Sequence, residues 1–141
     1  LIDRGTEVLG DPAYREKLLP ITGEIAENIY NTAYKNHSLM NECERGVDDT
    51  TRVWWVQAEA VVGFLNAWQK KPEETKYLDA AKDIWGYIKE YVIDKREGSE
   101  WFWCVNADGS PIHEPIVEPW KCPYHNGRMC MEVIRRLSTQ Q

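Results

Sequence analysis

The stretch RVWWVQAEAVVGFLNAWQ, Arg52–Gln69, decides the fold of this 141-residue chain. Its apolar side chains fall into three stripes at helical spacing, so a helix formed here is apolar on nearly every side. Such a helix must be buried on nearly every side, which predicts an inner helix with Asp49 or Thr50 as its cap. Glu59 is the exception, because burying a carboxylate is costly unless something pairs with it.

The segment after this helix predicts a second layer. Residues 73–94 combine a three-four apolar period with charged residues on the opposite face, which is typical of an outer helix. An inner helix, a short turn and an outer helix form the repeating unit of an α/α barrel. The sequence therefore predicts an all-α fold of this kind.

The segment before the inner helix predicts two more helices and a loop. Apolar residues at helical spacing over residues 1–9 stop at Gly10, which predicts the end of a first helix. Asp11 and Pro12 then predict the start of a second helix over residues 12–34, which can bend at its internal proline. Residues 36–49 are polar and have no hydrophobic period, so we expect a loop there.

The last forty residues predict a small hairpin and a final helix. Aromatic residues at 100–105 precede the turn sequence NADGSP at 106–111, which indicates a short β-hairpin. Four prolines between 111 and 123 exclude a helix there. Asn126 is then expected to cap a helix over residues 127–137.

Composition and charge exclude several classes of function. The formal net charge is −6 and no run of Lys and Arg occurs, which argues against a nucleic-acid partner. No uninterrupted apolar run reaches the length of a membrane span. The four cysteines show no C-x-x-C or paired histidine spacing, so we expect no metal site and free thiols in a reducing cytoplasm.

Two titratable residues are candidates for chemistry. His125 lies just before the predicted last helix, where the unpaired N–H groups of a helix start favour the neutral, basic form of imidazole. This position suits a general acid or base, although a histidine that only caps a helix fits equally well. Glu59 needs a partner, and Arg52, Arg128 or a substrate hydroxyl could provide it; the alternative is a structural salt bridge.

Seven tryptophans indicate a deep core, a carbohydrate-stacking surface, or both. Trp54 and Trp55 are adjacent and point about 100° apart on a helix, so one can join the core while the other lines a cavity. Polar neighbours mark Trp55 and Trp120 as candidates for stacking on sugar rings. Core packing is the alternative role for each of them.

Two strings in this sequence carry a resemblance to a known family. W-W-V-Q-A-E at 54–59 and P-Y-H-N-G-R at 123–128, in this order and about seventy residues apart, resemble the N-acylglucosamine 2-epimerase superfamily, and within it the cellobiose 2-epimerases. The resemblance spans nearly the whole chain. It implies that residues 1–141 are the C-terminal third of a single (α/α)6-barrel domain, with the N-terminal part absent.

The resemblance also implies a reaction and a set of site residues. Members invert C2 of an aldose at the reducing end through an enediolate, with no metal or organic cofactor. His125 resembles the acid/base histidine, Glu59 and Trp55 resemble residues of the substrate pocket, and Trp120 resembles the aromatic residue that stacks on a disaccharide. The second histidine of the family belongs to a Gly-His-x-x-Glu segment, which we expect upstream of Leu1.

Several expectations follow from an incomplete barrel. The fragment alone should be inactive, because inversion needs both histidines, and its uncovered apolar helix should promote self-association. The alternatives within the superfamily are an N-acylglucosamine 2-epimerase and an aldose-ketose isomerase of the same fold. The alternative from another class is a non-catalytic carbohydrate-binding helical domain.

Overall fold

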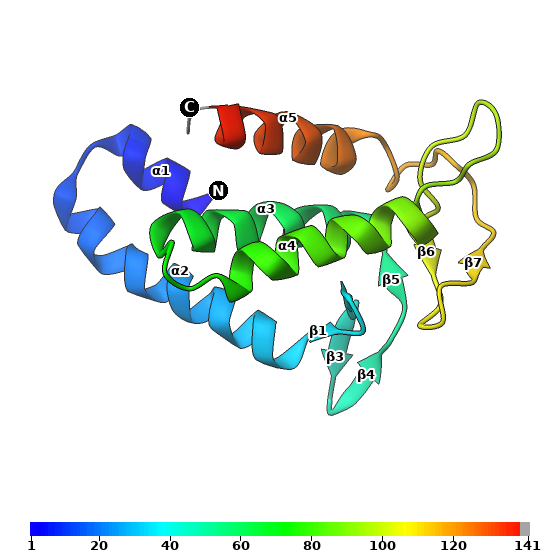
Figure 1. Ribbon diagram of the computed structural model, residues 1–141, viewed down its shortest axis with the longest axis horizontal. Helices are drawn as coiled ribbons and strands as arrows, with labels where there is room; N and C mark the ends of the chain where they lie inside the picture. The colour runs from blue at the N-terminus through cyan, green and yellow to red at the C-terminus, as the bar shows by residue number, and fades with distance from the viewer. Residues whose placement is uncertain (139–141) are drawn as a thin grey trace.

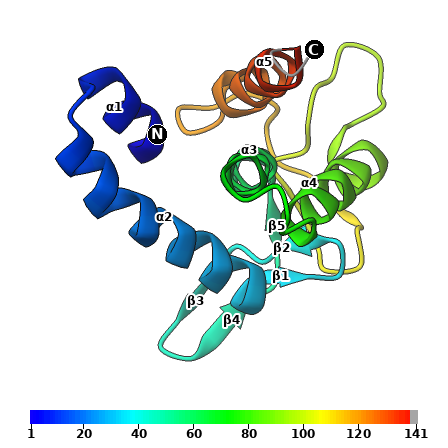
Figure 2. The same ribbon diagram turned by 60° about the vertical axis from the view of Figure 1, so that its left-hand side comes forward.

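Helix α3, Trp54–Lys70, forms the centre of the molecule in a computed structural model that describes residues 1–138. Figure 2 shows α3 nearly end-on, with α4 (Lys76–Tyr87) and α5 (Tyr124–Ser138) packed beside it. Nine side chains of α3 are buried, among them Trp54, Ala58 and Phe64. The predicted inner helix and the all-α character of the fold are confirmed.

The start of α3 differs from the prediction. Strand β5, Arg52–Val53, pairs antiparallel with β6, Cys104–Val105, and the helix begins only at the next residue. Val53 occupies the N-cap and makes no side-chain cap hydrogen bond. The predicted cap at Asp49 or Thr50 is therefore wrong, because the backbone ahead of α3 is used in a sheet; the carboxylate of Asp49 accepts from Thr51 instead.

Helix α4 confirms the predicted outer helix, with a shorter extent. It continues into a π-helical turn, η1, Ile88–Val92, so the helical path ends close to the predicted residue 94. Ile84, Ile88 and Val92 are fully buried against the core, whereas Lys89 and Glu90 face outward. This amphipathic division covers one side of α3.

The N-terminal helices α1, Ile2–Leu9, and α2, Pro12–Thr32, form an arm beside this core (Figure 1). Gly10 ends α1 in the left-handed conformation at φ 71°, and the Asp11 side chain accepts from the Ala13 N–H at 2.9 Å. Both predicted signals are confirmed. None of the side chains of α2 is buried, although the helix carries an apolar stripe.

The predicted loop over residues 36–49 is wrong, because two small hairpins occupy it. The first pairs β1, Tyr34–Lys35, with β2, Ser38–Leu39, and the second pairs β3, Glu42–Glu44, with β4, Val47–Asp49. Both turn on two residues with positive φ, namely Asn36 and His37 in the first and Arg45 and Gly46 in the second. Two-residue turns of this kind match the twist of paired strands, which explains why polar segments still pair.

The C-terminal hairpin is confirmed, and the last helix begins earlier than predicted. Strand β6 pairs with β7, Pro111–Ile112, so the hairpin extends the sheet that β5 starts. Helix α5 begins at Tyr124, with the Gly127 N–H donating to the Pro123 carbonyl at 3.0 Å. Asn126 therefore lies inside the first turn rather than at the cap, as does His125. Within residues 1–138, no helix combines the length and the apolar character needed to cross a membrane.

Candidate active site

The contact between α3 and α5 brings Glu59 and His125 together. The Nδ1 atom of His125 lies 2.9 Å from Oε1 of Glu59, and Arg128 donates from its guanidinium to Oε2 of the same carboxylate at 2.7 Å. His125 and Arg128 are three residues apart and so share one face of α5. A single carboxylate on α3 thus holds an imidazole and a guanidinium, one on each oxygen.

This geometry fixes which nitrogen of His125 carries hydrogen. An ionised carboxylate only accepts hydrogen bonds, so Nδ1 must be the donor to Glu59. In the neutral ring, Nε2 then keeps its lone pair and can accept a proton. The side chains of His125 and Glu59 are 33% and 32% exposed, so a substrate can reach the pair. An imidazole held in this way can act as a general base.

The two adjacent tryptophans divide between core and cavity, as the sequence predicts. Trp54 is 2% exposed and packs its ring 4.7 Å from that of Trp103, centroid to centroid. Trp55 is 42% exposed, and its ring centroid lies 5.7 Å from that of His125. Trp55 therefore presents an aromatic surface directly beside the candidate base.

A cavity of about 570 Å³ adjoins this cluster and is lined by Trp55, Glu59 and Arg128. Side chains of α1 and α2 supply much of the remaining, largely apolar wall. Asp3 also lines it: burial works to raise the pKa of its carboxyl, but hydrogen bonds from Asn66 and Thr22 outweigh this and hold the pKa below its ordinary value. The cavity wall thus combines several charged and polar side chains with a larger number of apolar ones.

The other predicted residues fall outside this cluster. Trp120 lies in the turn 118–121, is 83% exposed, and is not among the described residues that line the cavity. Its proposed stacking on sugar stays a prediction. Arg52 does not pair with Glu59, since its buried guanidinium donates to the hydroxyl of Ser38 and to backbone carbonyls.

Arg128 is the site residue that the sequence alone does not single out. The sequence indicates it only as one of several possible partners of Glu59, yet it both pairs with that carboxylate and lines the cavity. The signal available in the sequence is its position three residues after His125. That spacing places two side chains on one helix face as soon as both belong to α5.

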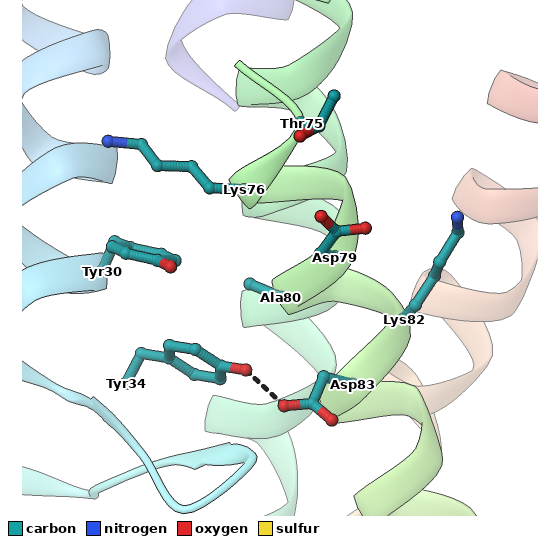
Figure 3. A pocket seen from close by; sticks show the side chains of 8 residues that line it. All are labelled: Tyr30, Tyr34, Thr75, Lys76, Asp79, Ala80, Lys82 and Asp83. Atoms are coloured by element: carbon teal, nitrogen blue, oxygen red, sulfur yellow. Dashed lines mark hydrogen bonds between the residues drawn. The ribbon is translucent and has the colours of Figure 1, made fainter.

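A second cavity of about 580 Å³ lies between α2 and α4 and offers a different chemistry (Figure 3). Tyr30 and Tyr34 reach across from the α2 side, and the hydroxyl of Tyr34 donates to Asp83 on α4. Asp83 also contacts Nδ1 of His37 at 2.7 Å. Because the Asp83 carboxylate already binds Tyr34 and His37, we interpret this cluster as packing of the first hairpin against α4.

Metal-ligating side chains do not form a cluster in the described part of the chain. No three His, Cys, Asp or Glu side chains gather there closely enough to hold a metal ion.

Comparison with known proteins gives relatives over nearly the whole chain. The model of the N-acylglucosamine 2-epimerase (GlcNAc 2-epimerase) family matches residues 9–128. The cellobiose 2-epimerase of Ruminococcus albus is 52% identical over 137 residues, which are 96% of this chain and 35% of that protein. The chain therefore spans about a third of the length of the curated relatives it matches.

Solved structures give the same picture. A crystal structure of a sugar epimerase from a ruminal bacterium matches with a TM-score of 0.93 and 51% identity, over 96% of this chain and 35% of that one. The structure of cellobiose 2-epimerase from Bacillus thermoamylovorans B4167 matches with a TM-score of 0.85 and 48% identity, over 95% of this chain and 34% of that one.

Proposed function

Because this chain belongs to the N-acylglucosamine 2-epimerase family, we propose that it is the C-terminal part of a sugar 2-epimerase acting on cellobiose or related β-1,4-disaccharides. Its helices are a portion of the (α/α)6 barrel of its structural neighbours. The observation that carries the proposal is the hydrogen bond between His125 and Glu59, with Trp55 alongside. The longer protein that would contain these residues is called the full-length epimerase below.

The proposed reaction inverts C2 of the reducing-end glucose. The sugar ring opens to the aldehyde, whose carbonyl makes the C2 proton acidic. A base removes that proton, a planar enediolate forms, and a proton returns to the opposite face. His125 is suited to one of the two proton transfers, since Nδ1 is held by Glu59 and Nε2 is left to exchange the proton.

The neighbouring side chains would bind and orient the sugar. Trp55 offers an exposed ring beside His125 on which the C–H face of a sugar can pack. Arg128 neutralises Glu59 and lies at the cavity wall, where charge builds up on the enediolate oxygens. Trp120 is proposed as the shelf for the second sugar ring, and Trp120→Ala should then raise KM for cellobiose more than it lowers kcat.

The main test removes the proposed base. In the full-length epimerase, His125→Asn should lower turnover of cellobiose by about 10²–10⁴-fold while sugar affinity stays nearly intact. His113→Asn is a matched control, because His113 is exposed and outside the cluster. Retained turnover in His125→Asn defeats the assignment. Sugar binding without any turnover in the unmutated protein would favour a carbohydrate-binding domain.

Product analysis separates the alternatives within the family. A 2-epimerase converts cellobiose to glucosyl-mannose, whereas an aldose-ketose isomerase gives glucosyl-fructose. An N-acylglucosamine 2-epimerase would prefer an acylated amino sugar over cellobiose as substrate. Chromatography of the products from each substrate therefore decides among the three.

We expect the 141 residues alone to be inactive, because inversion needs a proton carrier on each face of the enediolate. The test incubates the isolated chain with cellobiose in heavy water, with the full-length epimerase as control. Deuterium at C2 of glucosyl-mannose formed by the isolated chain would contradict this expectation.

The isolated chain is also expected to self-associate, but through faces other than the inner helix that the sequence indicated, because most apolar side chains of α3 are buried. Apolar side chains of α1, α2 and α5 are exposed, including Leu9, Ile25 and Ile134. Sedimentation velocity of the isolated chain should show dimers or larger species. The full-length epimerase should not associate through these faces. A strictly monomeric isolated chain would contradict the expected self-association.

A further inference from the structure

Lys121 is a lysine whose side chain is completely buried in the described structure. It follows Trp120 directly and is 0% exposed. Its ammonium group donates to the Glu100 carboxylate and to the Ile116 carbonyl, the latter at 2.9 Å. Burying an ammonium group is costly unless such partners are present, so the contact with Glu100 determines whether this turn can adopt its observed place.

The second carboxylate oxygen of Glu100 accepts hydrogen bonds from two other groups. Oε2 accepts from Nδ2 of Asn126 at 2.9 Å and from the backbone N–H of Trp101 at 2.8 Å. Among residues 1–138, the Asn126 side chain makes no hydrogen bond other than this one to Glu100. One carboxylate on the segment before β6 therefore holds two separate parts of the chain.

Each of these parts adjoins a proposed site residue. Lys121 follows Trp120, and Asn126 follows His125 in the first turn of α5. The two parts also meet through Trp54, whose ring lies 5.7 Å below the Lys121 ammonium and 6.4 Å, edge-on, from the imidazole of His125. Glu100 is thus linked to both residues without contacting either.

We propose that Glu100 is a positioning residue that holds the Trp120 turn and the His125 turn of α5 in fixed relation, so that the sugar shelf and the base face one substrate. This inference rests on the proposed function. It predicts that loss of the Glu100 carboxylate affects substrate binding and proton transfer together. A buried group that only stabilises the fold would change neither in the molecules that remain folded.

The charge of Glu100 matters as much as its shape. Three donors converge on its two oxygens, and one of them is an ammonium group. A glutamine has a single oxygen and brings two hydrogens of its own, so it must turn its NH₂ toward Lys121 or toward Asn126 and the Trp101 N–H. Toward Lys121, the NH₂ opposes the ammonium group and breaks that link. Toward the other side, it opposes the Trp101 N–H, and Asn126 keeps its link only by reversing its amide so that Oδ1, which has no hydrogen-bond partner among the described residues, accepts instead.

The experiment measures kcat and KM for cellobiose in the full-length epimerase carrying Glu100→Gln. Glu97→Gln, on an exposed residue of the same segment, is the matched control. In Glu100→Gln, kcat/KM should fall by on the order of tenfold to a hundredfold, because small displacements of reacting groups are costly in rate. The control should match the unmutated protein.

Two further variants separate the links. Lys121→Met should raise KM by about tenfold with little change in kcat, because it frees only the Trp120 turn. Asn126→Ala should lower kcat by about tenfold with little change in KM, because it frees only the His125 turn. These variants also carry the test if Glu100→Gln does not fold.

The outcomes are distinguishable from those of the proposed function. Unchanged kcat and KM in folded Glu100→Gln, or identical effects of Lys121→Met and Asn126→Ala, overturn the positioning role. If the unmutated protein does not turn over sugar at all, the proposed function fails instead. The NMR signals of the His125 ring then still report on positioning, since they should shift in Glu100→Gln and stay unchanged in Glu97→Gln.

Discussion

The first turn of α5 has two sides that contain the same kinds of residue in different settings. The open side adjoins the cavity and comprises Trp55, Glu59, His125 and Arg128. The closed side faces the interior and comprises Trp54, Glu100, Lys121 and Asn126. Each side has one tryptophan and one glutamate that binds at least one residue of α5. Glu59 accepts from two side chains, whereas Glu100 accepts from two side chains and one backbone N–H.

The carboxylates themselves hardly differ, whereas their surroundings do. Glu59 and Glu100 are both about one quarter to one third exposed, but the cation on Glu100 is sealed while the imidazole on Glu59 can be reached. The tryptophans follow the same division. The comparison teaches that the access of a partner, more than the presence of an ion pair, separates a reacting cluster from a structural one.

The largest expected effect tests the open side. Glu59→Gln should lower kcat by about a thousandfold, because the amide turns donors toward His125 or Arg128 and disturbs the tautomer that leaves Nε2 basic. The free energy of unfolding, from urea titration of the full-length epimerase, should change by about 1 kcal/mol or less. Loss of stability with normal turnover of the folded protein would reverse the assignment of the two sides.

Replacement of each tryptophan compares the two sides directly. Trp54→Ala should destabilise the protein by about 3–5 kcal/mol, because it removes a fully buried ring. Trp55→Ala should cost about 1 kcal/mol or less and act on KM for cellobiose instead. Equal losses of stability in the two variants would show that the cavity wall is part of the core.

A more conservative change sharpens the account of the open side. Arg128→Lys keeps the positive charge but loses the guanidinium that donates to Glu59, so kcat should fall by about tenfold. Arg15→Lys, on the exposed face of α2, is the control. If Arg128→Lys behaves like the control, then charge alone is enough at this position.

The smallest effect concerns an ion pair outside both sides, between α2 and α4. Hydrogen bonds from Lys76 and Tyr77 lower the pKa of Glu27 from its ordinary 4.5 to about 2. Because the folded-state pKa is depressed, the stabilisation is present above pH 4.5 and is lost as the pH falls toward 2.

The variant Glu27→Gln should therefore flatten the loss of stability between pH 4.5 and 2, as followed by circular dichroism during acid unfolding. Glu24→Gln, one turn earlier on α2, is the matched control. If the loss of stability between pH 4.5 and 2 is unchanged in Glu27→Gln, then the ion pair between Glu27 and Lys76 contributes nothing measurable to stability.

The helices could be predicted from the sequence because their signals are local. The stripes of α3 and the Gly10–Asp11–Pro12 junction each lie within a few residues, and both are confirmed. The start of α3 could not be predicted in this way. Arg52 and Val53 join a strand whose partners are about fifty residues later in the chain, and no local pattern reports such a pairing.

Three residues of the candidate cluster, Trp55, Glu59 and His125, could be singled out from the sequence, whereas their contacts could be predicted only in part. His125 and Glu59 stand out because each is an unusual residue in its surroundings. Their meeting depends on how α5 crosses α3, which no spacing records, and for that reason Arg128 could not be chosen over Arg52. The role of Lys121 and Glu100 left no sequence signal, since an isolated Lys and Glu resemble any surface pair.

The Glu59 carboxylate binds both His125 and Arg128 of α5, and this limits how the protein can be altered. Each residue added to a helix rotates all later side chains by about 100°, so one insertion in the first turn of α5 after His125 would turn Arg128 away from Glu59. The exposed segment 113–117 lies outside the helix, so a change of length there does not rotate α5, but the Ile116 carbonyl within it accepts from Lys121. Protein engineers can therefore change the length of residues 113–115, or fuse a label there, while Ile116 must stay within reach of Lys121 and the α5 turn must keep its residue count.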